Sequence, residues 1–230
     1  MYTTLPQTQT LVRSFFNRTY SWMTAGLALT AAIAYLTAHN PALLDRVLDN
    51  YILLIVAQFG IVLGLSFLIN RVSASVASVL FMLYSALTGL TFATLFLRYN
   101  AGDITSAFVV SAGMFGAMSF LGYVTKRDLT RFGGILLMAL IGLVVASLVN
   151  IFLASGPLTW IISIFGVILF SALTAYDTQK LRQMALSGLD ASSEMGEKMA
   201  VFGALTLYLD FINLFLFVLR LFGLGGSSRN

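Results

Sequence analysis

LTLYLDFINLFLFVLRLFG, at Leu205–Gly223, is an apolar run with one acidic residue, Asp210, in its interior. It belongs to a segment, Met199–Gly223, that is long enough to cross a bilayer as a helix, which takes about 20 mostly apolar residues. Asp210 lies about 11 residues into this segment, or roughly 16 Å deep at 1.5 Å per residue, near the bilayer midplane. The run is continuous rather than alternating, which excludes a barrel strand.

Six further runs of comparable length and hydropathy come before it in the chain. They are Tyr20–Ala38, Tyr51–Ile69, Val76–Leu97, Ile104–Thr125, Ile135–Ala154 and Trp160–Leu181. The 230 residues are 59% hydrophobic and only 10% charged, whereas a soluble domain carries about 25% charged residues. We therefore expect an all-α integral membrane protein, a single seven-helix bundle over residues 20–223, between a tail at residues 1–19 and a short tail at residues 224–230.

The basic residues predict the orientation of the chain. Of the thirteen Lys and Arg residues, most fall on the side of the N-terminus, in or beside short loops: Arg13, Arg18, Arg71, Lys126, Arg127, Arg131, Lys180, Arg182 and Lys198. The other side has Arg46, Arg98, Arg220 and Arg229. Loops rich in Lys and Arg stay in the cytoplasm, so we expect a cytoplasmic N-terminus and an outside C-terminus. This pattern also explains the net charge of +4 without a nucleic-acid partner, and leaves the lipid bilayer as the expected one.

Several chemistries are excluded by what the sequence lacks. There is no cysteine, and the lone histidine, His39, lies in the first external loop, away from the acidic residues. A Ser-His-Asp triad, an HExxH zinc site and a thiolate site are therefore ruled out. No Gly-rich phosphate loop with a lysine is present, which argues against nucleotide hydrolysis. We expect no enzyme and no resident cofactor.

The informative residues are two aspartates at membrane depth, Asp210 and Asp177, the latter in FSALTAYDTQKL. Thr206 and Asn213 share a helical face with Asp210 and form a polar stripe with it. Because the last two spans are consecutive and antiparallel, the two carboxyl groups can meet. They would then share a proton and titrate as a pair. In the deprotonated state the pair would bind a metal cation, and its hard oxygen ligands favour calcium.

Structural alternatives remain for each of these residues. Asp210 could instead bond to a neighbouring helix, and Asp177 could be a helix-end residue paired with Lys180. Arg71 follows the second span on the same side as Asp177. It is either a charge-assisted latch on Asp177 or an ordinary loop arginine.

Four segments resemble the Bax inhibitor-1 family, also called the transmembrane Bax inhibitor motif family. They are the quoted Leu205–Gly223 stretch, FSALTAYDTQKL at Phe170–Leu181, LYSALTGLTF at Leu83–Phe92 and GMFGAMSFLGYVTKRDL at Gly113–Leu129, the last two similar to bacterial members. The resemblance implies seven helices with the last one central, and a pH-sensitive calcium leak. It places the family's aspartate pair on Asp177 and Asp210 and its gating arginine on Arg71. Many members carry an acid in the second helix, where this chain has Gln58.

Three functions follow as hypotheses. The first is a calcium or other cation leak channel, or slow transporter, in the cell inner membrane, gated by protonation of Asp177 and Asp210. The second is a protein that transports nothing and modulates membrane-protein partners by direct interaction through its tail and helix faces. The third and least favoured is an intramembrane hydrolase that uses the two aspartates as an acid-base pair.

Overall fold

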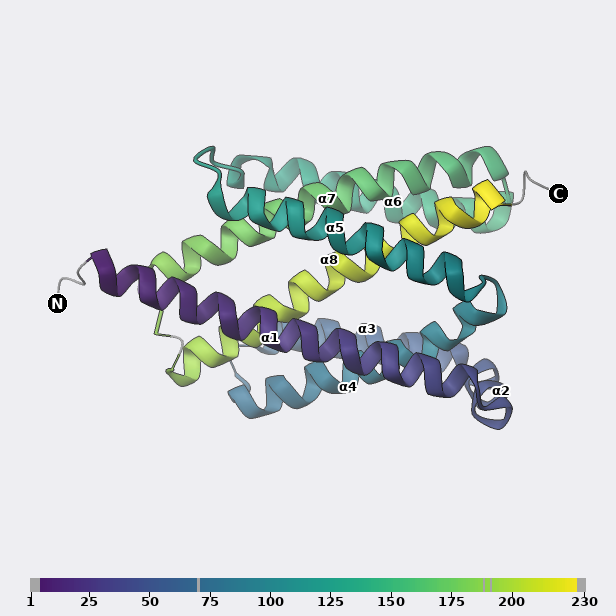
Figure 1. Cartoon of the computed structure of the whole chain (residues 1–230), viewed down its shortest axis with the longest axis horizontal. Helices are drawn as coiled ribbons and strands as arrows, with labels where there is room; N and C mark the ends of the chain where they lie inside the picture. Colours follow the sequence, from purple (N-terminus) through teal and green to yellow (C-terminus); the bar gives the residue numbers. More distant parts are fainter. Residues whose placement is uncertain (1–4, 70, 188, 191, 227–230) are drawn as a thin grey trace. The chain divides into compact units, whose positions relative to one another are not determined.

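The computed structural model describes residues 5–69, 71–187, 189–190 and 192–226, and the secondary structure in these ranges is helical throughout. In chain order (Figure 1) the elements are α1 (Leu5–Ala38), α2 (Pro41–Asp49), α3 (Tyr51–Leu68), α4 (Ala74–Phe92), the short 3-10 helix η1 (Ala93–Leu97), α5 (Ala101–Val124), the 3-10 turn η2 (Thr130–Phe132), α6 (Gly133–Leu153), α7 (Gly156–Leu186) and α8 (Glu194–Gly226).

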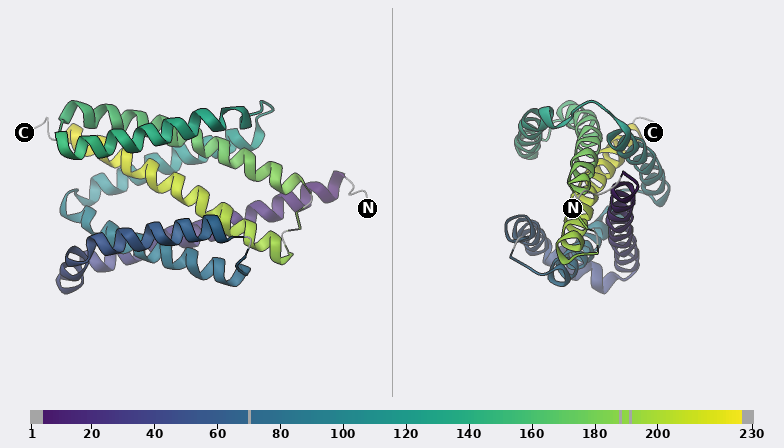
Figure 2. Two further views of the ribbon diagram at one scale, coloured as in Figure 1. Left: turned by 180° about the vertical axis from the view of Figure 1, so that it is seen from behind. Right: turned by 90° about the vertical axis from the view of Figure 1, so that its left-hand side faces the viewer.

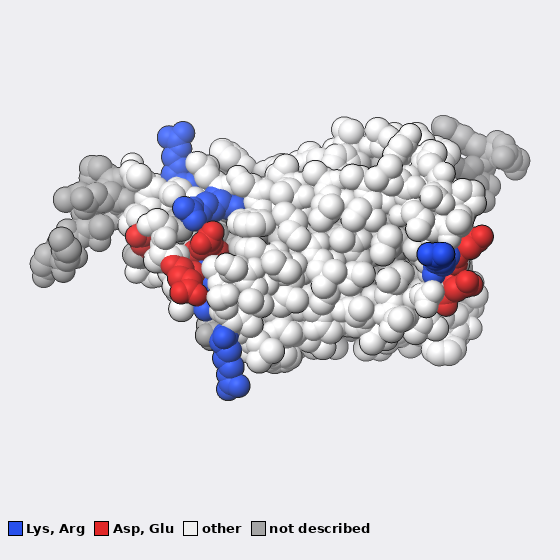
Figure 3. Space-filling view, turned by 90° about the horizontal axis from the view of Figure 1, so that it is seen from below, with Lys and Arg blue, Asp and Glu red and all other residues white. Residues whose placement is uncertain are grey.

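Within the described ranges, seven helices are long and apolar enough to cross a membrane. They are α1, α3, α4 continued by η1, α5, η2 continued by α6, α7 and α8. Many large apolar side chains lie on the surface, and Phe152, Phe67 and Ile52 are exposed by 88%, 80% and 78%. Figure 3 shows one face on which uncharged atoms cover the long helices and charged side chains gather near helix ends. The expected all-α multi-span fold is confirmed.

The chain divides into two compact units. Unit 1 comprises residues 1–100 and 182–208, and unit 2 comprises residues 101–181 and 209–230. The helix α8 belongs to both, because its first half packs in unit 1 and its second half in unit 2. It can be followed from one to the other in the two views of Figure 2.

In unit 1, Tyr208 of α8 is fully buried among α1 and α4. Its ring meets those of Phe81 and Tyr84 edge-on, with centroids 5.7 and 5.8 Å apart. Its hydroxyl lies 2.6 Å from that of Thr30 on α1, and Thr30 in turn donates to the carbonyl oxygen of Ser85 on α4 at 2.8 Å. One tyrosine therefore joins three helices by packing and hydrogen bonds together.

In unit 2, two phenylalanines of α8 fill the space between α5 and α7. Phe211 meets Phe108 and Phe115 of α5, with ring centroids 5.5 and 5.7 Å apart. Phe217 stacks on Phe170 of α7 at 5.8 Å. Aromatic pairs of this geometry stabilise a core beyond the area that they bury.

The last helix is the most buried of the spans. Of its apolar window 72% is buried, against 44% for α7 and only 6% for α3 and α6. A helix that is apolar on all sides and also buried belongs inside a bundle, whereas α3 and α6 present their side chains to lipid. The burial of α8 agrees with the expectation of a central C-terminal helix.

The first helix starts earlier than expected. It begins at Leu5 rather than Tyr20, so the described part of residues 1–19 is helical and continuous with the first span, and its assignment as a tail outside the membrane stays a prediction. Its inner face has Val12, Phe15 and Thr19, exposed by 4%, 0% and 0%. Residues spaced three and four apart share one side of a helix, so this short apolar stripe packs into unit 1 and extends the span.

The connection between the first two spans also differs from the expected loop. Residues Pro41–Asp49 form α2, with Pro41 in the first turn and the side chain of Asn40 accepting a hydrogen bond from the amide of Leu43 at 3.2 Å. Proline is favoured at this position because its missing N–H has no partner in a first turn. Pro157 plays the same part in α7, which begins at Gly156 instead of Trp160.

Candidate functional site

The two predicted aspartates come together in unit 2. Asp177 lies in the last third of α7 and Asp210 near the middle of α8, and their carboxyl groups are within hydrogen-bonding reach of each other. Asp210 is 5% exposed, and Asp177 is half-buried. A hydrogen bond between two carboxyl groups requires that one of them carries a proton. The arrangement can therefore hold one proton between two acids inside a membrane-spanning bundle.

The polar surroundings of the pair are sparse and unequal. Among the described residues, no hydrogen-bond partner meets Oδ2 of Asp210, which is completely buried. On the other side of the pair, the positive charge of Lys180 acts on Asp177 from one turn further along α7. Burying a carboxyl group without a donor is costly, so the pair depends on its mutual contact, a proton or a cation.

Close helix packing fixes the position of the pair. At Gly166 of α7, a Cβ atom would lie 2.6 Å from the ring of Phe217, and at Gly122 of α5 it would overlap the carbonyl group of Ala175. Small residues at such points let membrane helices approach closely. The hydroxyls of Ser119 on α5 and Thr178 on α7 complete the contact at 3.1 Å. Asp177 thus stands on a helix that is held firmly on two sides.

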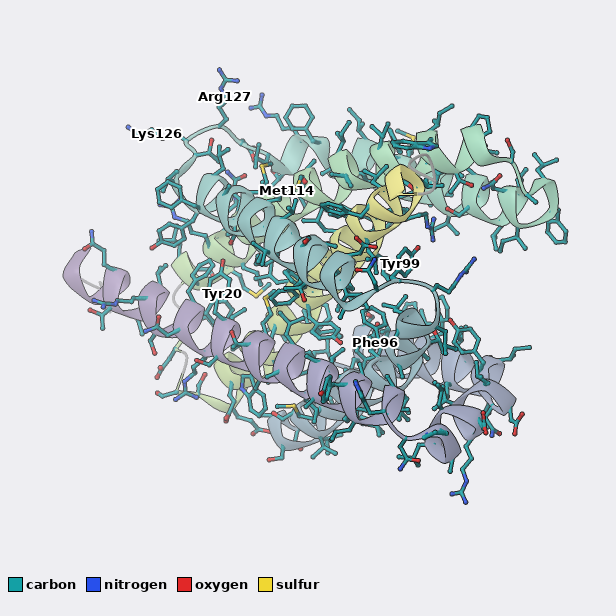
Figure 4. The ribbon with its side chains drawn as sticks, turned by 45° about the vertical axis from the view of Figure 1, so that its right-hand side comes forward. Tyr20, Phe96, Tyr99, Met114, Lys126 and Arg127 are labelled. Carbon is teal, nitrogen blue, oxygen red and sulfur yellow. The ribbon has the colours of Figure 1, made fainter. Side chains whose placement is uncertain are left out.

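Gln179, two residues after Asp177, holds the α5–α6 connection against α7. Its side-chain oxygen accepts a hydrogen bond from the amide of Leu129 at 2.7 Å, and its side-chain nitrogen donates to the carbonyl oxygen of Arg127 at 2.8 Å. Figure 4 shows the neighbouring side chains of Lys126 and Arg127 extending away from the helices. The sequence analysis did not single out this residue, which is 4% exposed, because its role depends on where the α5–α6 connection passes.

The two polar residues predicted to support Asp210 bond to their own helix. The hydroxyl of Thr206 donates to the carbonyl oxygen of Phe202 at 3.1 Å. The side-chain amide of Asn213 donates to the carbonyl oxygen of Leu209 at 2.8 Å. Such bonds one turn back are common for polar side chains in membrane helices. A role for Thr206 and Asn213 beside the pair stays a prediction.

Arg71 lies just after α3, and its side chain is exposed. It belongs to unit 1, whereas both aspartates belong to unit 2. The predicted latch between Arg71 and Asp177 therefore stays a prediction. Gln58 of α3 accepts a long hydrogen bond of 3.4 Å from Thr88 of α4.

A permanent metal centre has little support. Over the described part of the chain, no group of three or more His, Cys, Asp or Glu side chains comes together. The Asp177–Asp210 pair offers two carboxyl groups, and calcium in proteins takes six to eight oxygen ligands. Any cation at the pair would need water, hydroxyl or backbone oxygens to complete its shell.

The fold and the buried acidic pair define an all-α, multi-span membrane protein. The model of the family described as inhibitor of apoptosis-promoting Bax1 matches residues 12–228. The chain belongs to this family, the Bax inhibitor-1 family.

Three of its curated relatives are bacterial proteins. It is 51% identical to the inner membrane protein YbhL of Escherichia coli over 215 residues, which cover 92% of each chain. It is 52% identical over 219 residues to an uncharacterized protein of Deinococcus radiodurans, covering 95% of this chain and 92% of the relative. A third relative, from Borreliella burgdorferi, is 42% identical over 212 residues and 91% of each chain. The likeness spans the whole bundle and places the chain among multi-pass inner membrane proteins.

Proposed function

We propose that this protein is a slow leak channel or transporter for cations, calcium in particular, gated by protonation of Asp177 and Asp210. The observation that supports it most directly is the contact between the two carboxyl groups on adjacent membrane-spanning helices, one of them fully buried at Oδ2 without a donor among the described residues. Ionisable residues at membrane depth are rare and usually mark ion or proton pathways.

The proposed gate follows from the charge of the pair. With a proton between them, the two carboxyl groups attract each other through a hydrogen bond and hold α7 and α8 together. Without that proton, two negative charges in contact repel each other unless a cation enters. The protonated pair is the closed state, and loss of the proton favours the open or ion-bound state. Flux therefore rises with pH.

The two carboxylates suit a site that binds a calcium ion weakly and releases it, as opposed to one that holds the ion permanently. Carboxylate oxygens suit calcium better than softer metals, and the irregular geometry suits it better than magnesium. Two carboxylates without a third acid in the described residues give a weak site, because affinity for calcium grows with the number and rigidity of charged ligands. A weak site releases its ion, as a conduction pathway requires.

The proposal includes the orientation and the latch. The excess of basic residues beside the N-terminal side of the spans supports a cytoplasmic N-terminus and an outside C-terminus. In the closed state Arg71 would pair with Asp177 from the cytoplasmic side. Replacement of Arg71 by Gln would then shift the pH at which flux begins, whereas Arg131→Gln, at a side chain that is 82% exposed, would leave it unchanged.

The experiment is calcium uptake into proteoliposomes as a function of pH. The wild type should show flux that rises with pH, and Asp210→Asn and Asp177→Asn should each abolish this dependence. Asp45→Asn, at an exposed position on α2, is the matched control and should behave like the wild type. An unchanged pH profile in both intramembrane variants would refute the gate, and absence of flux at every pH would refute transport.

A further inference from the structure

The connection between α5 and α6 carries basic side chains that point outward. Lys126 and Arg127 are exposed, and among the described residues neither of them forms an ion pair. The acidic residue of the connection, Asp128, is already engaged. It accepts hydrogen bonds from the hydroxyl and the amide of Thr130, and its Oδ2 lies 3.7 Å from Nε of Arg131. The positive charges of Lys126 and Arg127 are therefore available to an external anion.

Lys180 of α7 adds a third positive charge beside this connection. It is exposed and directly follows Gln179, whose side chain bonds to the carbonyl oxygen of Arg127 at 2.8 Å and to the amide of Leu129 at 2.7 Å. The backbone that carries Lys180 therefore lies next to the connection. We call Lys126, Arg127 and Lys180 the basic cluster, which gathers three positive charges at one end of unit 2.

The backbone beneath the basic cluster is held at both ends of the connection. In addition to the two bonds from α7, the amide of Arg127 donates to Oγ1 of Thr125 at 3.2 Å. At the other end, a Cβ atom at Gly133 would stand 2.6 Å from the hydroxyl of Tyr176 on α7. Figure 4 shows the side chains of Lys126 and Arg127 extending away from this fixed backbone. Binding at the cluster therefore needs little further ordering of the loop.

The connection lies at the depth of the lipid headgroups. The 24 residues of α5 extend about 36 Å at 1.5 Å per residue. This length exceeds the hydrocarbon core of about 30 Å but not the whole bilayer of about 40–45 Å. Tyr123, in the last turn of α5, is 38% exposed, and Phe132, at the end of η2, is 52% exposed. Because aromatic side chains such as tyrosine are typical of the membrane interface, the basic cluster lies at the level of phospholipid phosphates.

We propose that the basic cluster binds the phosphate groups of anionic phospholipids. Lysine and arginine donate charge-assisted hydrogen bonds to phosphate oxygens, and each adds about fivefold to the affinity for an anionic membrane surface. Retention of a loop in the cytoplasm requires only its positive charge, so it does not account for the fixed backbone under the cluster. The site goes beyond the proposed function, since it does not depend on whether the protein transports ions.

Native mass spectrometry of the full chain in detergent tests the site. It compares the binding of phosphatidylglycerol with that of phosphatidylcholine with the same acyl chains. The test variant removes the three charges of the cluster: Lys126→Gln, Arg127→Gln and Lys180→Gln. The control variant removes the same charge at three exposed positions of unit 1: Arg13→Gln, Arg46→Gln and Arg98→Gln.

The wild type and the control variant should bind phosphatidylglycerol at least about tenfold more tightly than phosphatidylcholine, and the test variant should bind the two within about threefold of each other. An equal loss of preference in both variants would overturn the proposal, because net charge alone would then explain the binding. A wild type without any preference would overturn it as well.

Acetylation of the wild-type lysines provides a second test that needs no variant and therefore no refolding control. In mixed micelles, phosphatidylglycerol should slow the acetylation of Lys126 and Lys180 at least about threefold relative to phosphatidylcholine, because a lysine bound to phosphate is shielded. Lys198 is the reference and should not change, since it is 6% exposed and donates to the carbonyl oxygen of Val72 at 3.0 Å.

Unchanged acetylation of Lys126 and Lys180 in phosphatidylglycerol would overturn the proposal even if the test variant failed to fold. Equal protection by inorganic phosphate alone would show a site for small anions and would overturn its assignment to lipid.

Discussion

Gly166 of α7 lies directly against the ring of Phe217 of α8, so closely that a Cβ atom at position 166 would stand 2.6–2.7 Å from three of its carbons, Cγ and both Cδ atoms. This contact is one of the points that hold α7 against α8 on the same pair of helices as Asp177 and Asp210. The ring is also stacked on Phe170 of α7 and approached by the guanidinium of Arg220 at 5.5 Å. It has little freedom to move aside.

A methyl group at position 166 should therefore destabilise the bundle. We expect Gly166→Ala to lower the free energy of unfolding by about 1–3 kcal/mol, the usual cost of overpacking a well-packed core. Gly142→Ala on α6 is the control, because a Cβ atom there meets nothing within 4 Å, and it should be neutral or slightly stabilising. Denaturation in detergent micelles measures both. Equal stability of the two variants would contradict the tight contact.

Gln179 should be required for the order of the α5–α6 connection. Gln179→Leu removes both hydrogen bonds and leaves the amide of Leu129 and the carbonyl of Arg127 without their partner, at a cost of about 0.5–1.5 kcal/mol for each partly buried hydrogen bond lost. We expect faster amide exchange at Leu129 and faster tryptic cleavage after Lys126 and Arg127.

Gln183→Leu, one turn further along α7 and exposed, provides the comparison for Gln179 and should leave both rates as in the wild type. Cleavage that is equally fast in the two variants would mean that the connection is held by something else.

The hydrogen bond between Thr30 and Tyr208 should be measurable as a coupling energy in unit 1. A double-mutant cycle with Thr30→Val and Tyr208→Phe isolates it, because the accompanying loss of the bond from Thr30 to the Ser85 carbonyl cancels. We expect a coupling of about 0.6 kcal/mol, and not above about 1.7 kcal/mol, the range for hydrogen bonds between membrane helices. Strictly additive effects on unfolding would show that the 2.6 Å contact contributes nothing.

The amide of Thr130, at the start of η2, should lose protection from hydrogen exchange at low pH. Thr130 donates to Oδ1 of Asp128 through its hydroxyl and its amide, at 2.5 and 3.0 Å, and these bonds hold the pKa of Asp128 below its ordinary value. A carboxyl group whose pKa is lowered by folding stabilises the folded form above its unfolded pKa, and that contribution is lost as the pH falls through the folded pKa. The amide of Thr130 should therefore be protected at neutral pH and less so in acid.

Hydrogen exchange, expressed as protection factors to remove its intrinsic pH dependence, checks the behaviour of Asp128. Asp128→Asn should show no acid step, because the amide cannot titrate. The same step in wild type and variant would rule out Asp128 as its origin.

Hydropathy predicted the spans well because the bilayer imposes one length on every crossing helix. It did not predict the nine-residue helix α2, because the sequence Asn40-Pro41 at its start is typical of a turn. Only the structure shows that Asn40 caps a helix that begins at Pro41. The early start of α1 was missed for a related reason, since Val12, Phe15 and Thr19 form only a short stripe in a polar segment. Length and mean hydropathy are enough to detect membrane spans. Short packed helices depend instead on capping side chains and on contacts with other helices, which cannot be read from the sequence.

The acidic pair was predictable because consecutive antiparallel helices usually lie side by side, which can bring Asp177 and Asp210 within range of each other. Gln179 was not, because its role depends on where the α5–α6 connection passes. Among the described residues, the hydroxyls of Ser111 on α5 and Ser171 on α7 have no hydrogen-bond partner. This could not be recognised from the sequence either, since most serines in such helices bond one turn back.

The two hydrogen bonds of Gln179 set a practical limit on engineering this chain. They bind backbone atoms only two residues apart, the carbonyl of Arg127 and the amide of Leu129. The number of residues between these two atoms is therefore constrained, whereas most surface loops tolerate insertions. An epitope tag or fluorescent reporter inserted between these residues would break the grip and disturb the helix that carries Asp177. Such reporters belong at a chain end, where no side chain of α7 sets the spacing.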